Sequence, residues 1–378
     1  MRAVKAVWQR YHPSEELLWL LEQFRRMLND CIRIGLAENV TSLKALSLKA
    51  YGQLKGYEVP SYYKLCAISR ATGILRNHRK AKRRDRRARG PHARRLQLVT
   101  CYGFKIKDDD LFLPFKSRQP FQIPLNQHIQ RTLSNADLKV RSITLTADRL
   151  VIAYAKEVAE IQLKGLIGID RNLNNLTLAD SSGRVEWFNL VKATEIKAKY
   201  LTIKARFTRN DVRVRRRTFQ KYGLKERNKV QHILHNVSKH IVEDAKSRGF
   251  GIVMEDLKGI RGLYRKGNGQ GRFYRAKMNS WSFRELQRHI EYKARWSGLP
   301  VIYVKPYGTS SKCSMCGHRL SEENRTMSCA SCGLTVDRDV NAAKNILALG
   351  LRFRPAAQPI EAMVVEPQSE RNPQSRWL

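Results

Sequence analysis

Residues 328–347 read SCASCGLTVDRDVNAAKNIL, and this stretch joins a metal-binding pattern directly to a helix. It opens with a CxxC pair followed by glycine, which is typical of a tight turn whose thiolates hold a metal ion. Small residues then recur at helical spacing, so a close-packed helix is expected to begin near Asp339. Asp337 is the expected N-cap, and Asp339 would then project from the first turn. The stretch therefore predicts a metal turn that fixes where a carboxylate points.

A second CxxC pair, also followed by glycine, lies upstream of the first. The two pairs comprise Cys313, Cys316, Cys329 and Cys332. Four thiolates close the tetrahedral shell of one Zn²⁺. Two disulfides are the alternative, and they fit poorly in the reducing cytosol that we expect for this chain. We therefore expect one structural zinc ion that takes no part in chemistry.

Charge dominates the composition, because 72 Lys and Arg oppose 33 Asp and Glu, for a formal net charge of +39. Self-repulsion on that scale is tolerated most easily beside a polyanion. The basic residues are spread along the chain and mixed with aromatic residues, which suits a nucleic-acid groove better than a lipid surface. A merely solubilising basic surface is the alternative. No apolar run is long enough to span a bilayer, so we expect neither a membrane span nor a signal peptide.

The first part of the chain predicts strands interrupted by helices. Residues 1–10 alternate like a strand, residues from Ser14 onward recur at helical spacing, and further helices are expected at 41–55 and 61–80. Alternation of the β type returns at 98–158 and includes a hairpin. We expect a small β-barrel built from the two strand-rich segments, with the helices inserted between them.

Residues 76–95 hold eleven Lys or Arg in twenty positions. Contact with a phosphate backbone fits this run better than a solvated charge run does, because the whole chain is cationic. Candidate contacts with a nucleic-acid groove are Lys64, Arg70 and Arg76 in the helix expected at 61–80. Three more, Lys221, Arg227 and Lys229, lie in the second part of the chain. An ordinary surface cation is the alternative for each of the six.

The second part alternates strands and helices in the manner of an α/β domain. It contains a strand pair within 165–190, a basic helical region over 192–248, a wholly apolar strand at 250–254, and an amphipathic helix that ends at Gly298 before a last buried strand. Strands this apolar are typical of a parallel sheet covered on both faces. Residues 353–378 are rich in Pro, Gln and Ser, and we expect them to be disordered.

Three carboxylates stand where an open α/β sheet forms its ligand sites. Asp170 and Glu255 each end an apolar strand, and Asp339 begins the helix described above. A carboxylate at the end of a buried strand is costly unless it binds a cation or a partner. Grouped around two Mg²⁺ or Mn²⁺ ions, the three acids would activate water and stabilise the leaving oxygen of a phosphodiester. Ordinary alternatives are a turn residue, a surface acid and a second helix cap, and weaker candidates for the same role are Asp180, Asp256 and Asp337.

Five segments together resemble the TnpB family, the transposon-encoded OrfB-type proteins, which are similar to the compact type V CRISPR effectors. The segments are GIDRNLNNLTLAD, IVMEDLKGI, NSWSFRELQRHIEYKARWSGLPVIYV, GTSSKCSMCG and CGLTVDRDVNAAKNIL, in this order over about 161–350. Over 1–160 the resemblance rests on general layout. The chain departs from many relatives in one place, because Arg171-Asn172 follows the first acid where those relatives have Leu-Gly.

The resemblance implies an α/β RNase H-like (RuvC) nuclease domain with a four-cysteine zinc-ribbon insertion, and an N-terminal wedge β-barrel with an inserted helical recognition domain. The expected bounds are 1–12 and 98–160 for the wedge, 13–97 for the recognition domain, 161–308 and 339–352 for RuvC, and 309–338 for the zinc module. Asp170, Glu255 and Asp339 match the catalytic acids, and Cys313, Cys316, Cys329 and Cys332 match the zinc ligands. Residues 261–280 correspond to a mobile lid beside the site.

The activity implied by the resemblance is RNA-guided cleavage of double-stranded DNA next to a short transposon-adjacent motif, with a guide RNA from the transposon's own end. Two other functions stay open on the sequence. A DNA strand transferase would use the same acids without a guide, and a non-cleaving RNA-guided binder would need no metal chemistry. We expect a monomer in the cytoplasm of a prokaryote, associated with the nucleoid when bound to DNA.

Overall fold

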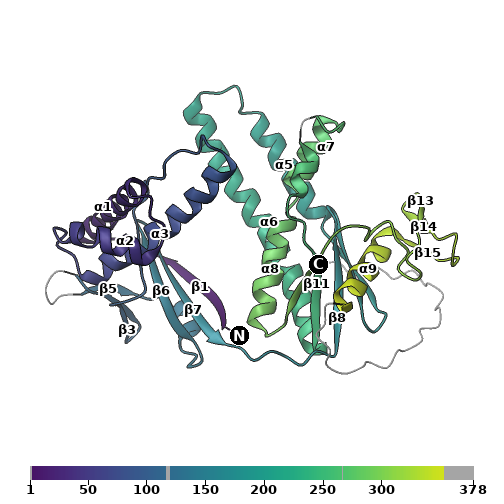
Figure 1. Cartoon of the computed structure of the whole chain (residues 1–378), viewed down its shortest axis with the longest axis horizontal. Coiled ribbons are helices and arrows are strands. Elements are labelled where there is room, and N and C mark those ends of the chain that lie inside the picture. Colours follow the sequence, from purple (N-terminus) through teal and green to yellow (C-terminus); the bar gives the residue numbers. More distant parts are fainter. Residues whose placement is uncertain (1, 116–119, 266, 353–378) are drawn as a thin grey trace. The chain divides into compact units, whose positions relative to one another are not determined.

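The computed structural model contains two compact units, one from Arg2 to Glu157 and one from Val158 onward (Figure 1). The described residues are 2–115, 120–265 and 267–352. The tail at 353–378, for which the sequence predicts disorder, lies outside the described residues. Within the described residues, no helix has the length and apolar character needed to cross a membrane.

The first unit contains two antiparallel sheets, a four-stranded one in the order β1-β7-β6-β2 and a three-stranded one in the order β3-β4-β5. Its strands are β1 (Arg2–Arg10), β2 (Gln97–Thr100), β3 (Lys105–Lys107), β4 (Asp110–Leu113), β5 (Phe121–Pro124), β6 (Lys139–Thr146) and β7 (Arg149–Glu157). β1 pairs with β7 along its whole length, from Arg2 opposite Glu157 to Arg10 opposite Arg149. The two ends of the unit therefore share one sheet, and the β6–β7 pairing confirms the predicted hairpin.

Helices fill the sequence between β1 and β2. They are α1 (Glu15–Ala37), α2 (Leu43–Ala50), the short η1 (Gly52–Leu54) and α3 (Ser61–Arg84), and α4 (Gln127–Leu133) follows β5. Ser14 begins α1 as the sequence predicts, because its side chain accepts a hydrogen bond from the Leu17 amide at 3.2 Å. The apolar stripe of α1 is fully buried at Leu20 and Phe24, and it packs against α3.

The second unit is built on a five-stranded mixed sheet in the order β10-β9-β8-β11-β12, which confirms the α/β pattern. Its strands are β8 (Gly165–Arg171), β9 (Asn175–Asp180), β10 (Val185–Asn189), β11 (Phe250–Glu255) and β12 (Val301–Val304). β8, β11 and β12 run parallel, whereas β9 and β10 form antiparallel hairpins on one side. Gly183 closes the predicted hairpin turn with a φ of 86°. Every residue of β8 is buried, as expected for a central strand covered on both faces.

Helices cover the two faces of this sheet unequally. They are α5 (Val191–Ala205), α6 (Val212–Arg248), η2 (Ile260–Tyr264), α7 (Arg272–Ser280), α8 (Phe283–Trp296) and α9 (Arg338–Arg352). The predicted basic helical region is thus two helices, because Asp211 caps a new helix by accepting from the Arg213 amide at 2.7 Å. Side chains of α6 and α8 form the large core with Ile167 and Ile252, whereas Ile346 of α9 packs on the opposite face.

The α9 helix lies unusually close to the sheet. A Cβ at Gly168 of β8 would approach the Ala343 carbonyl oxygen to 2.4 Å, and a Cβ at Gly350 of α9 would approach a Val253 methyl to 2.4 Å. Only glycine fits at such a contact. Figure 1 shows α9 lying beside β8.

Three short strands precede α9, namely β13 (Ser321–Glu323), β14 (Thr326–Ser328) and β15 (Thr335–Asp337). Asp337 ends β15, and its carboxylate accepts hydrogen bonds from the Asp339 amide at 2.8 Å and from the Val340 amide at 3.2 Å. Asp337 is therefore the N-cap and Asp339 lies in the first turn, as the sequence predicts. The last of these strands, β15, and α9 are joined without a linker.

Candidate active site and metal centre

Strand periodicity brings Asp170 and Glu255 to the α9 face of the sheet. Side chains alternate between faces, so Asp170 shares a face with Gly168, and Glu255 shares one with Val253, which packs toward α9. The parallel register pairs Ile169 with Met254, and the next step along both strands is Asp170 and Glu255. Neighbouring strands lie about 5 Å apart, so these two acids are adjacent at the carboxyl end of the sheet.

Asp339 reaches the same edge from the first turn of α9. Asp170 and Glu255 are each 8% exposed, and Asp339 is 5% exposed. Burial first, then the charges of Glu255 and Asp339, raise the pKa of Asp170 from its ordinary 3.8 to about 7. Burial also raises the pKa of Glu255, although a hydrogen bond from Thr309 and the charge of Arg171 oppose this. The three acids therefore form one electrostatic cluster, as the strand-end argument predicts.

Each acid is oriented by a different donor. Asn172 Nδ2 donates to Asp170 Oδ2 at 2.8 Å, and Thr309 Oγ1 donates to Glu255 Oε1 at 2.6 Å. Two groups reach Asp339 Oδ2, the Asn175 amide at 2.9 Å and the guanidinium of Arg325 in the β13–β14 turn. Each carboxylate has two oxygens, so these contacts orient the acids and leave acceptor capacity for a cation.

The acids have the chemistry of a divalent-cation site, but their carboxylate oxygens do not all lie close enough together to hold one shared ion. Across the described ranges, the four cysteines are the one group of three or more Cys, His, Asp and Glu side chains that lie close enough together to hold a single ion. Hard oxygen ligands suit Mg²⁺, which keeps water in its shell and needs few carboxylates. Three buried acids, one with a pKa of about 7, fit a site that a cation stabilises.

The four cysteines fit a zinc ion closely. Their Sγ atoms all lie within 4.8 Å of one another, with 3.6 Å between Cys313 and Cys332 and 3.4 Å between Cys316 and Cys329. Thiolates about 2.3 Å from a tetrahedral zinc ion would be about 3.8 Å apart. The fold thus brings the four expected ligands together. Because four thiolates would fill the tetrahedral shell of a zinc ion, the ion that they can hold is a structural one.

The two cysteine turns repeat the same backbone design. Gly317 donates its amide to the Cys313 carbonyl at 2.9 Å with a φ of 78°, and Gly333 does the same to Cys329 at 2.9 Å with a φ of 74°. Amides in the second turn, chiefly that of Cys332, lower the pKa of Cys329 to about 6. A lowered thiol pKa favours the thiolate, which is the form that binds zinc.

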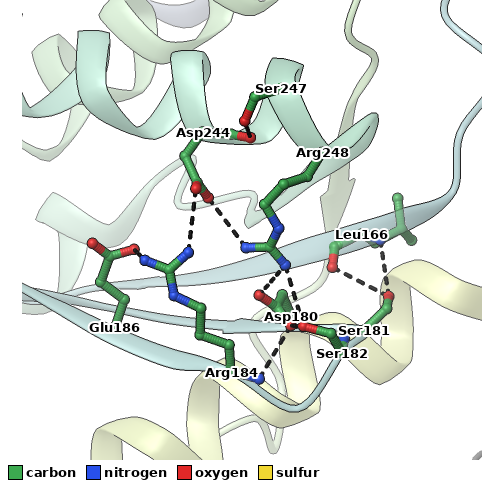
Figure 2. A network of polar contacts seen from close by, with 9 residues as sticks. All are labelled: Leu166, Asp180, Ser181, Ser182, Arg184, Glu186, Asp244, Ser247 and Arg248. Carbon is green, nitrogen blue, oxygen red and sulfur yellow. Dashed lines mark hydrogen bonds and ion pairs between the residues drawn. The ribbon is translucent and has the colours of Figure 1, made fainter.

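Asp180, one of the weaker acidic candidates, belongs to a separate network (Figure 2). Asp180 lies at the end of β9. Its carboxylate is contacted by the guanidinium of Arg248 of α6, and it accepts a hydrogen bond from the Ser182 hydroxyl at 2.6 Å. Burial opposes the ionised form, but hydrogen bonds from Ser182 and Arg248 outweigh it and lower the pKa of Asp180. Asp180 therefore fastens α6 to the sheet and is already neutralised by an arginine.

The other two weaker candidates also have local partners. Asp256 pairs with Lys258 at 2.8 Å, and Asp337 caps α9. Neither shares the buried cluster, since the side chain of Asp256 is 34% exposed and Asp337 is exposed.

Of the six basic candidates, three are exposed on α6 and three donate hydrogen bonds within the first unit. Lys221, Arg227 and Lys229 are exposed on α6, and Lys221 lies 6.0 Å from the Tyr222 ring centre. In the first unit, Arg76 donates to the Thr41 carbonyl at 3.0 Å, and Lys64 donates to the Lys55 carbonyl at 3.3 Å. Arg70 donates to Gln97 at 2.7 Å, and burial lowers its pKa, so this residue joins α3 to β2.

Sequence reasoning missed Thr309 and Arg325, two of the residues that orient the acids. Thr309 follows β12 in an irregular segment, and Arg325 sits at a φ of 70° in a hairpin turn. In the sequence Arg171 stands out only as a departure from many relatives. It is 2% exposed, and its guanidinium donates to the Glu255 carbonyl and, at 3.0 Å, to Gln287. The one available signal was that Arg171 is a charged residue within an apolar strand.

Comparison with known proteins points to Cas12f1-like proteins. Residues 283–346 match the family model described as Cas12f1-like, TNB domain. Among solved structures, a Cas12f1–sgRNA–target DNA complex has a TM-score of 0.64 at 15% sequence identity and covers 88% of this chain and 83% of that one. This chain therefore shares the fold of that Cas12f1 structure.

The chain belongs to the TnpB-like family. TnpB-like protein MJ0751 of Methanocaldococcus jannaschii is 31% identical over 226 residues, which cover 56% of this chain and 78% of that protein. The CRISPR-associated endodeoxyribonuclease Cas12f1 of Sulfoacidibacillus thermotolerans is 37% identical over 117 residues, which cover 30% of this chain and 25% of that protein.

Proposed function

We propose that this chain is an RNA-guided DNA endonuclease of transposon origin, which hydrolyses phosphodiester bonds with Asp170, Glu255 and Asp339 as its metal-binding acids. The observation that carries the proposal is the convergence of three buried acids at one edge of the sheet in a TnpB-like chain. The name of Cas12f1, a CRISPR-associated endodeoxyribonuclease, supports the same chemistry. The net charge of +39 supports polyanionic partners.

The acids would act together on a phosphodiester at the carboxyl edge of the sheet. Two Mg²⁺ or Mn²⁺ ions bound there would supply an activated water and stabilise the leaving oxygen. The protein's part is to hold the carboxylates in place: Asn172 orients Asp170, Thr309 orients Glu255, and Asn175 orients Asp339. Burial of all three keeps water from competing for these contacts.

The domain bounds follow the same proposal. We assign 1–12 and 98–160 to a wedge β-barrel and 13–97 to a helical recognition domain. The RuvC domain comprises 161–308 and 339–352, with 309–338 as a zinc-ribbon insertion. The partners in this scheme are a guide RNA from the transposon end and double-stranded DNA with a short flanking motif, held by a monomer in the prokaryotic cytoplasm and nucleoid.

The first test is to purify the chain after expression with its native flanking DNA and to sequence the RNA that co-purifies. A defined species with a constant scaffold and a variable 3′ segment is expected. Heterogeneous RNA, or none, would instead favour an unguided strand transferase with the same acids. A defined RNA without Mg²⁺-dependent cleavage of matching DNA would favour a non-cleaving binder.

The second test separates the proposed acids from their neighbours. Glu255→Gln should lower the cleavage rate by more than about a hundredfold, because loss of a ligand exceeds loss of a residue that merely supports one. Asp256→Asn is the matched control, since Asp256 is the next residue but pairs with Lys258 outside the cluster. Equal loss in both variants would contradict the assignment of Glu255.

A further inference from the structure

Two asparagines on α9 fasten the zinc module to the helix that carries Asp339. Asn341 is fully buried. Its Nδ2 donates to the Lys312 carbonyl at 2.8 Å, and its Oδ1 accepts from the Ser314 amide at 2.9 Å. These two residues flank the zinc ligand Cys313. The first cysteine turn is therefore fixed to α9 on both sides of its ligand.

Asn345, one helical turn further along α9, makes a second pair of contacts. Its Nδ2 donates to the Lys312 carbonyl at 2.7 Å and to the Thr309 carbonyl at 2.8 Å. An amide nitrogen carries two protons, so both bonds can form together. The stretch from Thr309 to Lys312, which directly precedes Cys313, is thus held at both of its ends by one side chain.

Thr309 in turn contacts the acid cluster. It is 4% exposed, and its Oγ1 lies 2.6 Å from Glu255 Oε1 and 3.1 Å from the Pro306 carbonyl. A hydroxyl has one proton to donate, and a carboxylate is the stronger acceptor, so the proton belongs to the bond with Glu255. In the part of the chain that the structure describes, no hydrogen bond from another side chain reaches this carboxylate.

The backbone of Glu255 is held independently of its side chain. Arg171 contacts the Glu255 carbonyl, and β11 pairs with β8 and β12 on either side. Strand pairing fixes the Cα position but leaves the side-chain rotamers open. The direction of the carboxylate therefore depends on Thr309.

We propose that Thr309 is a positioning residue for Glu255, and that Asn345 transmits the position of the zinc-bound turn to Thr309. The zinc module would then set the geometry of the acid cluster, although its ion performs no chemistry. This inference rests on the proposed function only in taking Glu255 as a ligand of a divalent cation. It adds residues outside the three acids and the four cysteines to the machinery of the site.

The test measures cation binding directly, on the full chain with its co-purifying RNA and its zinc. Mn²⁺ is titrated, and binding is followed by calorimetry and by the shift of the thermal midpoint. The variants are Thr309→Val, which removes the hydroxyl, Thr309→Ser, which keeps it, and Asn345→Ala. Lys344→Ala is the matched control, because Lys344 is the exposed neighbour of Asn345 on the same helix.

Thr309→Val should weaken Mn²⁺ binding at least about tenfold, since it removes a hydrogen bond to a charged acceptor, which is worth a factor of ten or more. Asn345→Ala should weaken Mn²⁺ binding in the same direction, because it releases the backbone of Thr309. Thr309→Ser and Lys344→Ala should stay within about twofold of the parent. Zinc content should be unchanged in Thr309→Val. The double variant should bind no more weakly than Thr309→Val, because both changes break one linkage.

Parent-like Mn²⁺ binding by Thr309→Val would overturn the inference, and so would equal weakening by Thr309→Ser. If Thr309→Val does not fold, Asn345→Ala and Thr309→Ser decide the matter by the same measurement. A parent protein that binds Mn²⁺ but cleaves no DNA contradicts the proposed function alone, because the variants are still compared by binding. A parent protein that binds no Mn²⁺ at all overturns both.

Discussion

Asp170→Asn should stabilise the protein in the absence of divalent cations other than zinc. Asp170 is 8% exposed, and burial together with the charges of Glu255 and Asp339 raises its pKa from 3.8 to about 7. The folded protein therefore binds a proton that the unfolded chain releases as the pH rises between these values. Stability contributed by that proton is present below about pH 4 and is lost as the pH rises through 7.

The magnitude follows from the difference of about three pH units. One unit corresponds to about 1.4 kcal/mol, so the ionisation of Asp170 destabilises the fold by at most about 4 kcal/mol at pH 8. An asparagine has nearly the same shape and cannot ionise. The free energy of unfolding of the variant should therefore exceed that of the parent by up to about 4 kcal/mol at pH 8, and the two should be nearly equal at pH 4.

Native-state hydrogen exchange suits this measurement, because protection of the β8 and β11 amides reports on the second unit alone. Asp180→Asn is the matched control. Asp180 is also a buried strand-end aspartate, but Ser182 and Arg248 lower its pKa despite its burial, so its loss should destabilise the protein at pH 8 by roughly 2 kcal/mol. The two variants must differ in sign. If Asp170→Asn lowers protection at pH 8, or raises it equally at pH 4, the electrostatic argument is wrong.

Further predictions concern zinc, acid lability and packing. Cys329→Ser should abolish the one-zinc stoichiometry measured by metal analysis, because the closed shell needs four thiolates. His289→Leu should reduce the loss of stability as the pH falls from 6.5 to 4, because burial and the nearby His235 lower the pKa of His289 to about 4 and the neutral ring must charge as the pH falls. Denaturant unfolding should show that Gly168→Ala destabilises by about 1–3 kcal/mol, since backbone of α9 blocks a Cβ there. Gly223→Ala, open on all sides in α6, should stabilise by about 0.5–1 kcal/mol.

The sequence predicts the acid cluster because simple periodicity determines it. Asp170 and Glu255 each end an apolar run, so strand geometry places both at one edge of the sheet. Asp339 follows an N-cap at a fixed distance from two cysteine turns, and that spacing determines where the helix begins. Each of these rules acts over a few residues, which is why a sequence pattern carries them.

Thr309 and Arg325, two of the residues that orient the acids, obey no such rule. Thr309 lies in an irregular segment, and the backbone around Arg325 adopts positive φ values at two consecutive residues. Side chains in turns and irregular segments do not recur at a regular spacing, so no sequence pattern predicts where they point. The basic candidates stay predictions, because a cation bound to a neighbour, such as Arg70 with Gln97, has the same sequence signal as a cation free to meet phosphate.

Two arginines of the chain itself balance the charge of the acid cluster. They differ in the free energy that displacing each guanidinium would cost. Arg171 is 2% exposed and bonded to the Glu255 carbonyl and Gln287, so releasing its guanidinium would leave buried donors without partners. The side chain of Arg325 is 61% exposed, and an ion pair of that kind contributes about 1 kcal/mol or less. A cation arriving at Asp339 can therefore displace Arg325 at little cost, whereas Arg171 stays. The fold thus keeps one permanent counter-charge beside Glu255 and one exchangeable counter-charge on Asp339, and the exchangeable one comes from the zinc module.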